Sequence, residues 1–180
     1  KAFTGGASVN ADNVLIDGIN AEKPKAPGVL LRGNNLTVQN SSVISPQEGD
    51  GDGMRFFGTN IKILHNVIRN TVGTEERHAD AIQTFATSDD FPASQNIVIE
   101  GNRFEDIANI CLIAEGPNSE AGDGSGEGKS SNFVFRNNYC QNGAGQAVLF
   151  DDVSDTTVQN NEIVGDVENA FEFQNKSTGA

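Results

Sequence analysis

A repeated pattern runs along the whole chain and constrains its fold more than any other feature. Each repeat begins with a short line of alternating apolar residues and is followed, after a gap, by a second apolar run. Six units at a spacing of roughly 22 to 37 residues indicate a solenoid, because stacked neighbours can bury an apolar side that one unit leaves open. The lines are NVLIDGI from Asn13, NLTVQNSSV from Asn35, NIKILHNVI from Asn60, NIVIEGNRF from Asn96, NFVFRNNYC from Asn132 and DTTVQNNEI from Asp155.

The spacing of apolar residues inside each line predicts β-strands. Apolar side chains fill two columns that lie two positions apart, as expected for a strand with one side on a core. A helix is disfavoured because Gly and Asn interrupt every unit within about six residues, short of the roughly 10 to 12 that a helix needs. The first column is Val14, Leu36, Ile61, Ile97, Phe133 and Thr156, and the second is Ile16, Val38, Ile63, Ile99, Phe135 and Val158.

The next two columns predict a repeated turn. Gly and Asn tolerate positive φ, and His is one of the few other residues enriched there, so we interpret His65 as a turn residue. In the following column, stacked asparagines can hydrogen-bond along the stack, each side chain serving the backbone of the next unit. We therefore expect a structural asparagine ladder. The turn column is Gly18, Asn40, His65, Gly101, Asn137 and Asn160, and the next is Ile19, Ser41, Asn66, Asn102, Asn138 and Asn161.

The repeated line N-x-[VI]-x-[NG]-N-x-[FI] with its asparagines resembles the right-handed parallel β-helix of the pectate-lyase-like superfamily, over essentially all of residues 13–176. The resemblance implies an all-β, single-stranded, right-handed solenoid of about six rungs, forming one domain over residues 1–180. That architecture hosts pectate and alginate lyases, polygalacturonase-type hydrolases, alginate epimerases and phage tailspikes, so it restricts fold more than function. The chain stops directly after a strand pattern, and we expect that it could be a fragment of a longer protein.

Composition limits the partners. A net charge of −13, from 25 acidic and 12 basic residues, argues against nucleic acid and anionic membranes, which are bound through clustered Lys and Arg. No apolar run approaches the roughly 20 residues that span a bilayer. We expect a secreted, extracellular protein. Cys111 and Cys140 fall in apolar columns, which favours two buried thiols over a disulfide or a metal pair.

Insertions mark where function would lie. They flank one strand column on the middle units only, and loops on a rigid scaffold are the usual carriers of binding and catalysis. We expect them to wall a groove whose floor is the outward side of that column, although the last insertion could equally be flexible decoration. The insertions are residues 45–52 and 71–80 before the column, and 86–94 and 115–131 after it.

Alternation predicts which side chains face the groove. Arg55 and Gln83 would then be neighbours on adjacent strands, about 4.8 Å apart. The predicted inward positions are Val29, Met54, Ile82, Cys111, Val148 and Phe171, then Leu31, Phe56, Thr84, Ile113, Phe150 and Phe173. The predicted outward positions are Leu30, Arg55, Gln83, Leu112, Leu149 and Glu172.

Polar and aromatic groups converge at this predicted floor. Planar rings can stack on sugars, and planar polar groups can bind hydroxyls or a carboxylate. The candidate substrate-binding residues are Arg77, Gln83, Phe57, Phe85 and Asp52, with Phe57 and Phe85 expected as an outward aromatic pair. A purely structural alternative treats Asp52 and Asp80 as strand-entry turn residues and Arg55 as their salt-bridge partner.

These groups predict a polysaccharide lyase acting on a uronate polymer. The candidate catalytic residues are His78 as base, Arg55 to neutralise the substrate carboxylate, and Asp80. Ca²⁺ could bridge carboxylates to the substrate, with Asp50, Asp52 and Asp80 as candidate ligands.

Three alternatives stay open. An epimerase is suggested because RHADA resembles the D-P-H-D motif of alginate epimerases, although the tyrosine of that pattern has no counterpart, the sole Tyr139 lying in the turn region. A hydrolase would use two or three carboxylates from Asp52, Asp80 and the Asp151–Asp152 pair, but lacks the polygalacturonase G-H-G and R-I-K signatures. A non-catalytic tailspike or adhesin segment would bind polysaccharide without turnover, and the sequence leaves the oligomeric state open.

Overall fold

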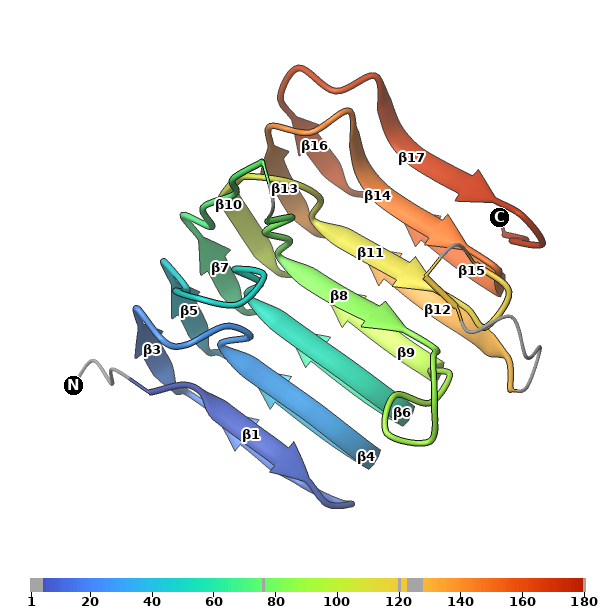
Figure 1. The fold of residues 1–180 in the computed structure, drawn as a ribbon, viewed down its shortest axis with the longest axis horizontal. Helices are drawn as coiled ribbons and strands as arrows, with labels where there is room; N and C mark the ends of the chain where they lie inside the picture. Colours follow the sequence, from blue (N-terminus) through green and yellow to red (C-terminus); the bar gives the residue numbers. More distant parts are fainter. Residues whose placement is uncertain (1–4, 76, 120, 123–127, 180) are drawn as a thin grey trace.

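The structure is a computed structural model that describes residues 5–75, 77–119, 121–122 and 128–179. The described chain is all-β, and every pair of strands in its sheets runs parallel. The strands form a coil with three walls, stacked along the molecule in Figure 1. None of the described residues forms a helix that could cross a membrane.

The first wall faces the viewer in Figure 1 and carries the predicted groove floor. Its strands pair in the order β1, β4, β6, β8, β11, β14, β17, with β4 and β6 contributing only their first halves. The bounds are β1 (Ala7–Asn10), β4 (Val29–Gln39), β6 (Met54–Leu64), β8 (Ile82–Phe85), β11 (Leu112–Glu115), β14 (Gln146–Asp151) and β17 (Asn169–Gln174).

The second and third walls complete the coil. The second wall joins the first into one sheet because β4 and β6 continue around the corner at Gly33 and Gly58. It contains β2 (Leu15–Asp17), the second halves of β4 and β6, β9 (Gln95–Glu100), β12 (Ser130–Arg136) and β15 (Val153–Gln159). The third wall contains β3 (Asn20–Glu22), β5 (Ser42–Ile44), β7 (Val67–Arg69), β10 (Arg103–Ile107), β13 (Tyr139–Asn142) and β16 (Glu162–Val164).

The corner between the second and third walls has the predicted turn. His65 has a φ of 54°, which confirms it as a left-handed turn residue. Beside it, Asn66 donates through Nδ2 to Oδ1 of Asn102 (3.1 Å), and Asn102 donates in the same way to Asn138 (3.1 Å). Each of these oxygens also accepts the backbone N–H of the asparagine before it, at 2.9 Å. The row therefore supplies partners for backbone groups that the turn leaves without strand bonds.

A second row of asparagines lines the corner between the first and second walls. Its members are exposed and have φ between 57° and 59°, and each amide after the first donates to the Oδ1 of the member before it at 2.8–3.0 Å. They begin the repeated lines in the sequence, but no hydrogen-bonded role was predicted for them. The outer row is Asn13, Asn35, Asn60, Asn96 and Asn132.

The interior is filled as the alternation predicts, with one register error and one exposed member: Phe173, predicted to face inward, stacks on Phe150 but is 43% exposed. The inward residues of the first wall pair in the expected order from Val29 through Met54 to Ile82. At β11 the prediction was wrong by one residue, because Leu112 and Ala114 face inward and Ile113 faces outward. Ile82 pairs with Leu112, not with Cys111, so Cys111 takes the position that Ala81 has before β8.

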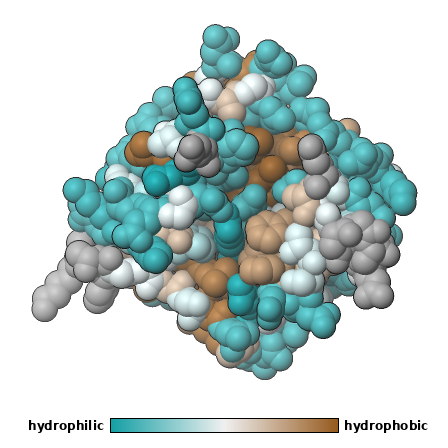
Figure 2. Space-filling view, in the orientation of Figure 1, coloured by the Kyte–Doolittle hydropathy of each residue, from teal (hydrophilic) through white to brown (hydrophobic). Residues whose placement is uncertain are grey.

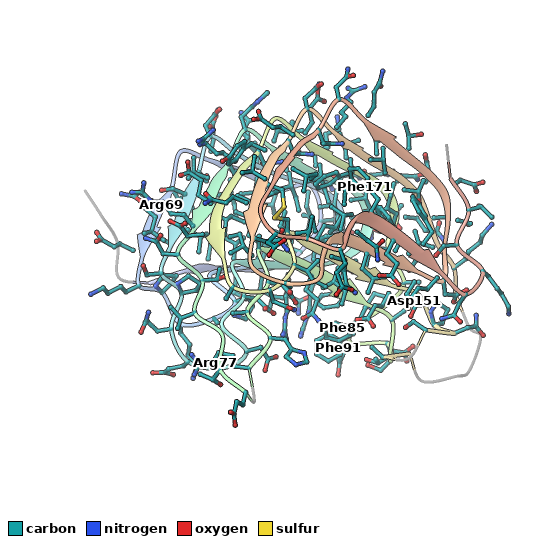
Figure 3. The ribbon with its side chains drawn as sticks, turned by 90° about the horizontal axis from the view of Figure 1, so that it is seen from above. Arg69, Arg77, Phe85, Phe91, Asp151 and Phe171 are labelled. Carbon is teal, nitrogen blue, oxygen red and sulfur yellow. A yellow bond between two sulfur atoms is a disulfide. The ribbon has the colours of Figure 1, made fainter. Side chains whose placement is uncertain are left out.

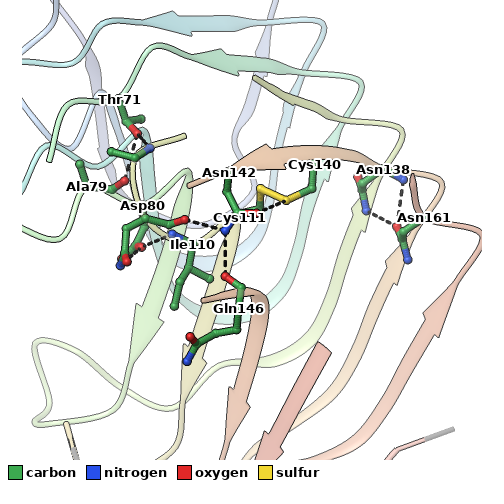
Figure 4. The surroundings of a disulfide bond; sticks show 12 residues. Thr71, Ala79, Asp80, Ile110, Cys111, Asn138, Cys140, Asn142, Gln146 and Asn161 are labelled. Atoms are coloured by element: carbon green, nitrogen blue, oxygen red, sulfur yellow. Dashed lines mark hydrogen bonds between the residues drawn. A yellow bond between two sulfur atoms is a disulfide. The ribbon is translucent and has the colours of Figure 1, made fainter. Parts of the chain in front are cut away.

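Cys111 and Cys140 form a disulfide, so the prediction of two free thiols was wrong (Figure 4). Both residues are fully buried, as their columns predicted. Cys111 lies just before β11 and faces β13 across the interior, where the two Cα atoms are 6.1 Å apart. Column matching could predict burial but not this cross-wall approach, because the approach depends on the register of β11.

Candidate functional site

Asp52 and Asp80 hold the entries to neighbouring strands of the first wall. Asp52 accepts the backbone N–H of Asp80 at 2.9 Å. Asp80 in turn accepts the backbone N–H of Ile110 (3.0 Å) and the side-chain amide of Asn109 (2.7 Å). Both carboxylates are 1% exposed, so they lie behind the surface that a ligand would touch.

Burial changes the proton affinity of these two carboxylates. It raises the pKa of Asp80 to about 8, with a further contribution from the nearby charge of Asp52. Burial also raises the pKa of Asp52, an effect that the positive charge of Arg55 opposes. Asp80 therefore keeps its proton to a higher pH than an ordinary carboxyl group does.

Arg55 projects outward from β6 between two aspartates. Its Nε donates to Asp52 at 2.7 Å, and Nη2 donates to Asp50 at 2.5 Å. The Arg55 side chain is 18% exposed, and the Asp50 side chain is 60% exposed. Arg55 therefore pairs with two carboxylates, as the purely structural alternative predicted. These contacts fix the guanidinium group at the surface of the first wall.

A cavity of about 230 Å³ brings together side chains from three segments. It is lined by Asp50, Arg55, His78 and Gln83. Arg55 and Gln83 pair in register on β6 and β8, as predicted, and exposed His78 comes from the loop before β8. Gln83 lines the cavity, and its Oε1 atom is buried without a hydrogen-bond partner.

An aromatic cluster adjoins the cavity. Phe57 lies outward as predicted, but it is fully buried beneath Phe85 and Phe91, each with its ring centre 5.0 Å away. Arg55 lies 5.5 Å above the Phe85 ring. Phe85 and Phe91 are the partly exposed rings, and Figure 2 shows hydrophobic surface at the middle of this face, bordered by hydrophilic residues.

Two guanidinium groups flank this part of the first wall. Arg32 packs 4.6 Å from the centre of the Phe91 ring, at the end of the strand column away from His78. Arg77 lies in the loop before β8, on the same side of the molecule as Phe85 and Phe91 in Figure 3. Within the described part of the chain, neither arginine forms an ion pair with a carboxylate. They are therefore better placed than Arg55 to meet an anionic group.

A group of carboxylates follows the same outward column further along the wall. Glu115 at the end of β11 pairs in register with Asp151 at the end of β14. Asp151 accepts a hydrogen bond from Asn175, and the adjacent Asp152 accepts the backbone N–H of Asn118 at 2.7 Å. Neighbouring strands lie about 4.8 Å apart, so these carboxylates form a compact acidic group.

The predicted calcium ligands do not fit a shared cation site. Asp50 and Asp52 both contact Arg55, while Asp80 is turned to Asn109 and Ile110. Among the described residues, no three His, Cys, Asp or Glu side chains are grouped to hold a metal. A Ca²⁺ ion requires six to eight oxygens, and these three carboxylates are committed elsewhere.

Sequence reasoning missed Arg32, Phe91 and Glu115. Arg32 shares a strand column with Phe57, which was a usable signal, and Glu115 opens a predicted insertion. Phe91 lies inside the insertion 86–94, where no repeat exists to align. Of the insertion 115–131, residues 120 and 123–127 lie outside the described residues.

Comparison with known proteins gives one family and one solved structure. The model described as "Right handed beta helix region" matches residues 5–180. The chain is similar to the catalytic unit of a thermostable GH87 alpha-1,3-glucanase from Streptomyces thermodiastaticus strain HF3-3, with 12% identity and a TM-score of 0.41. That similarity covers 97% of this chain and 46% of the glucanase unit. No curated protein matches the sequence.

Proposed function

Because the chain belongs to the right-handed β-helix family, we propose that it is a carbohydrate-active protein that cleaves an acidic polysaccharide by β-elimination. The family match agrees with the resemblance to the pectate-lyase-like superfamily. The single observation that carries the proposal is the cavity that joins His78 to Arg55 and Gln83 beside partly exposed aromatic rings. The finer description of the fold as a single-stranded solenoid of six rungs remains part of this proposal.

The reaction assigns a role to each group. A base removes the proton at C5 of a uronate, the electron pair forms the C4–C5 double bond, and the bond from C4 to the glycosidic oxygen breaks. The departing oxygen takes a proton from solvent water and leaves as a hydroxyl. His78 is the base, since it is exposed at the cavity and a neutral imidazole nitrogen can accept a proton. Gln83, which lines the cavity, donates a hydrogen bond to the sugar from its side-chain NH2 group.

Positive charge at the groove would hold the substrate carboxylate. We assign this role to Arg32 and Arg77, because Arg55 already shares its charge with two aspartates. Arg55 then acts chiefly by holding Asp50 and covering the Phe85 ring. Phe85 and Phe91 would stack against sugar rings.

The test is ultraviolet absorbance of the unsaturated product during incubation with a panel of polyuronates. We expect a rise with the native protein and its loss in His78→Asn. The matched control is His65→Asn, which changes the other histidine and keeps a residue that tolerates its positive φ. A flat trace across the panel, with no new reducing ends, would contradict cleavage and favour a protein that only binds polysaccharide.

Hydrolysis is the second candidate, favoured by the register of Glu115 and Asp151. A glycoside hydrolase needs two carboxylates flanking the bond, and these two end neighbouring strands. Both are buried, and the adjacent Asp152 is the partly exposed carboxylate of the group. This candidate predicts new reducing ends without ultraviolet absorbance. Asp151→Asn and Glu115→Gln would then lose activity, whereas His78→Asn would keep it.

A further inference from the structure

The second wall carries a cavity of about 440 Å³ on its outer surface, away from the groove of the first wall. Four members of the outer asparagine row line it at the corner, and residues of β4, β6, β9 and β12 form its floor. The lining consists of Asn35, Thr37, Asn60, Lys62, Asn96, Ile97, Val98, Asn132 and Val134.

The charge of this lining is unusual for the chain. The protein carries 25 acidic residues and 12 basic ones, yet among the residues that the structure describes no carboxylate lines the cavity and the one charged lining group is Lys62. Lys62 is exposed and, within the described part of the chain, pairs with no carboxylate. An acidic partner would find a complementary surface here and repulsion over much of the remaining protein.

The asparagines supply repeated hydrogen-bonding groups. Asn60 donates to Asn35, Asn96 donates to Asn60, and Asn132 donates to Asn96, at 2.8–3.0 Å. An amide has two N–H donors and an oxygen with two lone pairs, so each link leaves donor and acceptor capacity at the surface. Their strands lie about 4.8 Å apart, a spacing close to the length of one sugar residue.

A turn requirement explains only part of this arrangement. Positive φ favours asparagine at each corner position, and Asn13 meets the same requirement with a φ of 59° without lining the cavity. The turn requirement does not explain the hollow beside the row, which has partly exposed Val98 and Val134 on its floor. Apolar floor and amide edge together suit a sugar ring, which has C–H surfaces and hydroxyl rims.

We propose that this second-wall surface binds a strand of acidic polysaccharide laid along the coil, with sugar hydroxyls on the asparagine row and a carboxylate near Lys62. The choice of an acidic polysaccharide rests on the proposed function, whereas the cavity and its charge do not. The surface would anchor a long polymer while the first-wall groove acts on another part of it.

The test follows the asparagine side-chain amide signals by NMR, in His78→Asn protein, on addition of a polyuronate or its carboxyl-reduced counterpart. We expect shifts of the cavity asparagines with the polyuronate and weaker shifts with the reduced polymer. The double variant Asn60→Gly/Asn96→Gly should bind this surface about tenfold more weakly. Asn13→Gly, with the same backbone requirement outside the cavity, should bind like the parent.

The outcomes separate this inference from the proposed function. Shifts in the His78→Asn protein, together with no cleavage by the parent protein, would support the second-wall surface and contradict the proposed enzyme. Cleavage by the parent protein without shifts at the cavity asparagines would overturn this inference alone. Sedimentation that shows self-association lost in Asn60→Gly/Asn96→Gly would also overturn it, because the face would then pair with a second copy.

Discussion

Two corners of the coil differ in regularity. At the corner of the second and third walls, buried asparagines repeat the same hydrogen bonds although the chain between successive members is 36, 36 or 23 residues long. At the corner of the third and first walls, the chain enters the strands through loops of different length, and those loops carry Asp50, Arg77 and His78. The comparison indicates that buried amides fix the stacking of the turns at one corner. The loops at the other corner can therefore differ in length and carry the candidate site.

The largest expected effect comes from breaking the regular corner. Asn102→Ala removes an amide that donates to the backbone oxygen of Ile63 (2.8 Å) and accepts the backbone N–H of Asn66 (2.9 Å). Both backbone groups would stay buried without a partner, at about 1–3 kcal/mol each. We expect a loss of about 4 kcal/mol in the free energy of unfolding, measured with urea. The control Asn137→Gly, at the exposed neighbouring turn position, should change it by less than about 0.5 kcal/mol.

The disulfide comes next. It closes a segment with a sequence separation of 29 residues, and removing such a link costs about 3 kcal/mol. Urea unfolding of Cys111→Ala/Cys140→Ala should show this loss. An unchanged midpoint would mean that the walls are held in place without the covalent link.

The irregular corner should make stability depend on pH. Asp80 has a folded-state pKa of about 8 against an ordinary value of 3.8, so the folded protein binds this proton more tightly than the unfolded chain. Its stabilising contribution is full below pH 3.8 and is lost as the pH rises through 8. Thermal unfolding between pH 5 and pH 8 should therefore show a smaller decline in Asp80→Asn than in the parent. An equal decline in both proteins would contradict this assignment.

The smallest effect is expected in the loop of the candidate site. His78→Asn should change the free energy of unfolding by less than about 0.5 kcal/mol, because the side chain is exposed. The same variant should lose cleavage activity. A large loss of stability would show that the irregular corner also supports the fold, and would weaken the comparison.

The repeated part of the fold could be predicted because each column obeys a local rule. Alternation places Val29, Met54 and Ile82 inside, and positive φ explains His65 at its turn. The same rules place Arg55 beside Gln83 on adjacent strands, and the pairing of β6 with β8 confirms that placement.

The remainder depends on contacts that no column contains. The register of β11 places Cys111 one position before the strand, where it reaches Cys140. Phe91, which lies in an insertion, covers Phe57. The Phe57 ring, predicted to be exposed, is therefore buried. Asp80 was assigned to catalysis because acids near His78 suggest chemistry, whereas its partners are the backbone and side chain of the next turn.

The disulfide also has a mechanical consequence. From Cys111 the chain follows β11 and β12 to Cys140 on β13, so the bond closes a covalent ring around one turn of the coil. Pulled at its ends, a solenoid would peel apart turn by turn, because each turn holds only to its neighbours. The segment closed by the disulfide, with a sequence separation of 29, could not be stretched out, so the pulled chain would be shorter by roughly 100 Å of contour length. Under tension the molecule would lengthen on both sides of an inextensible link that lies beside the candidate site.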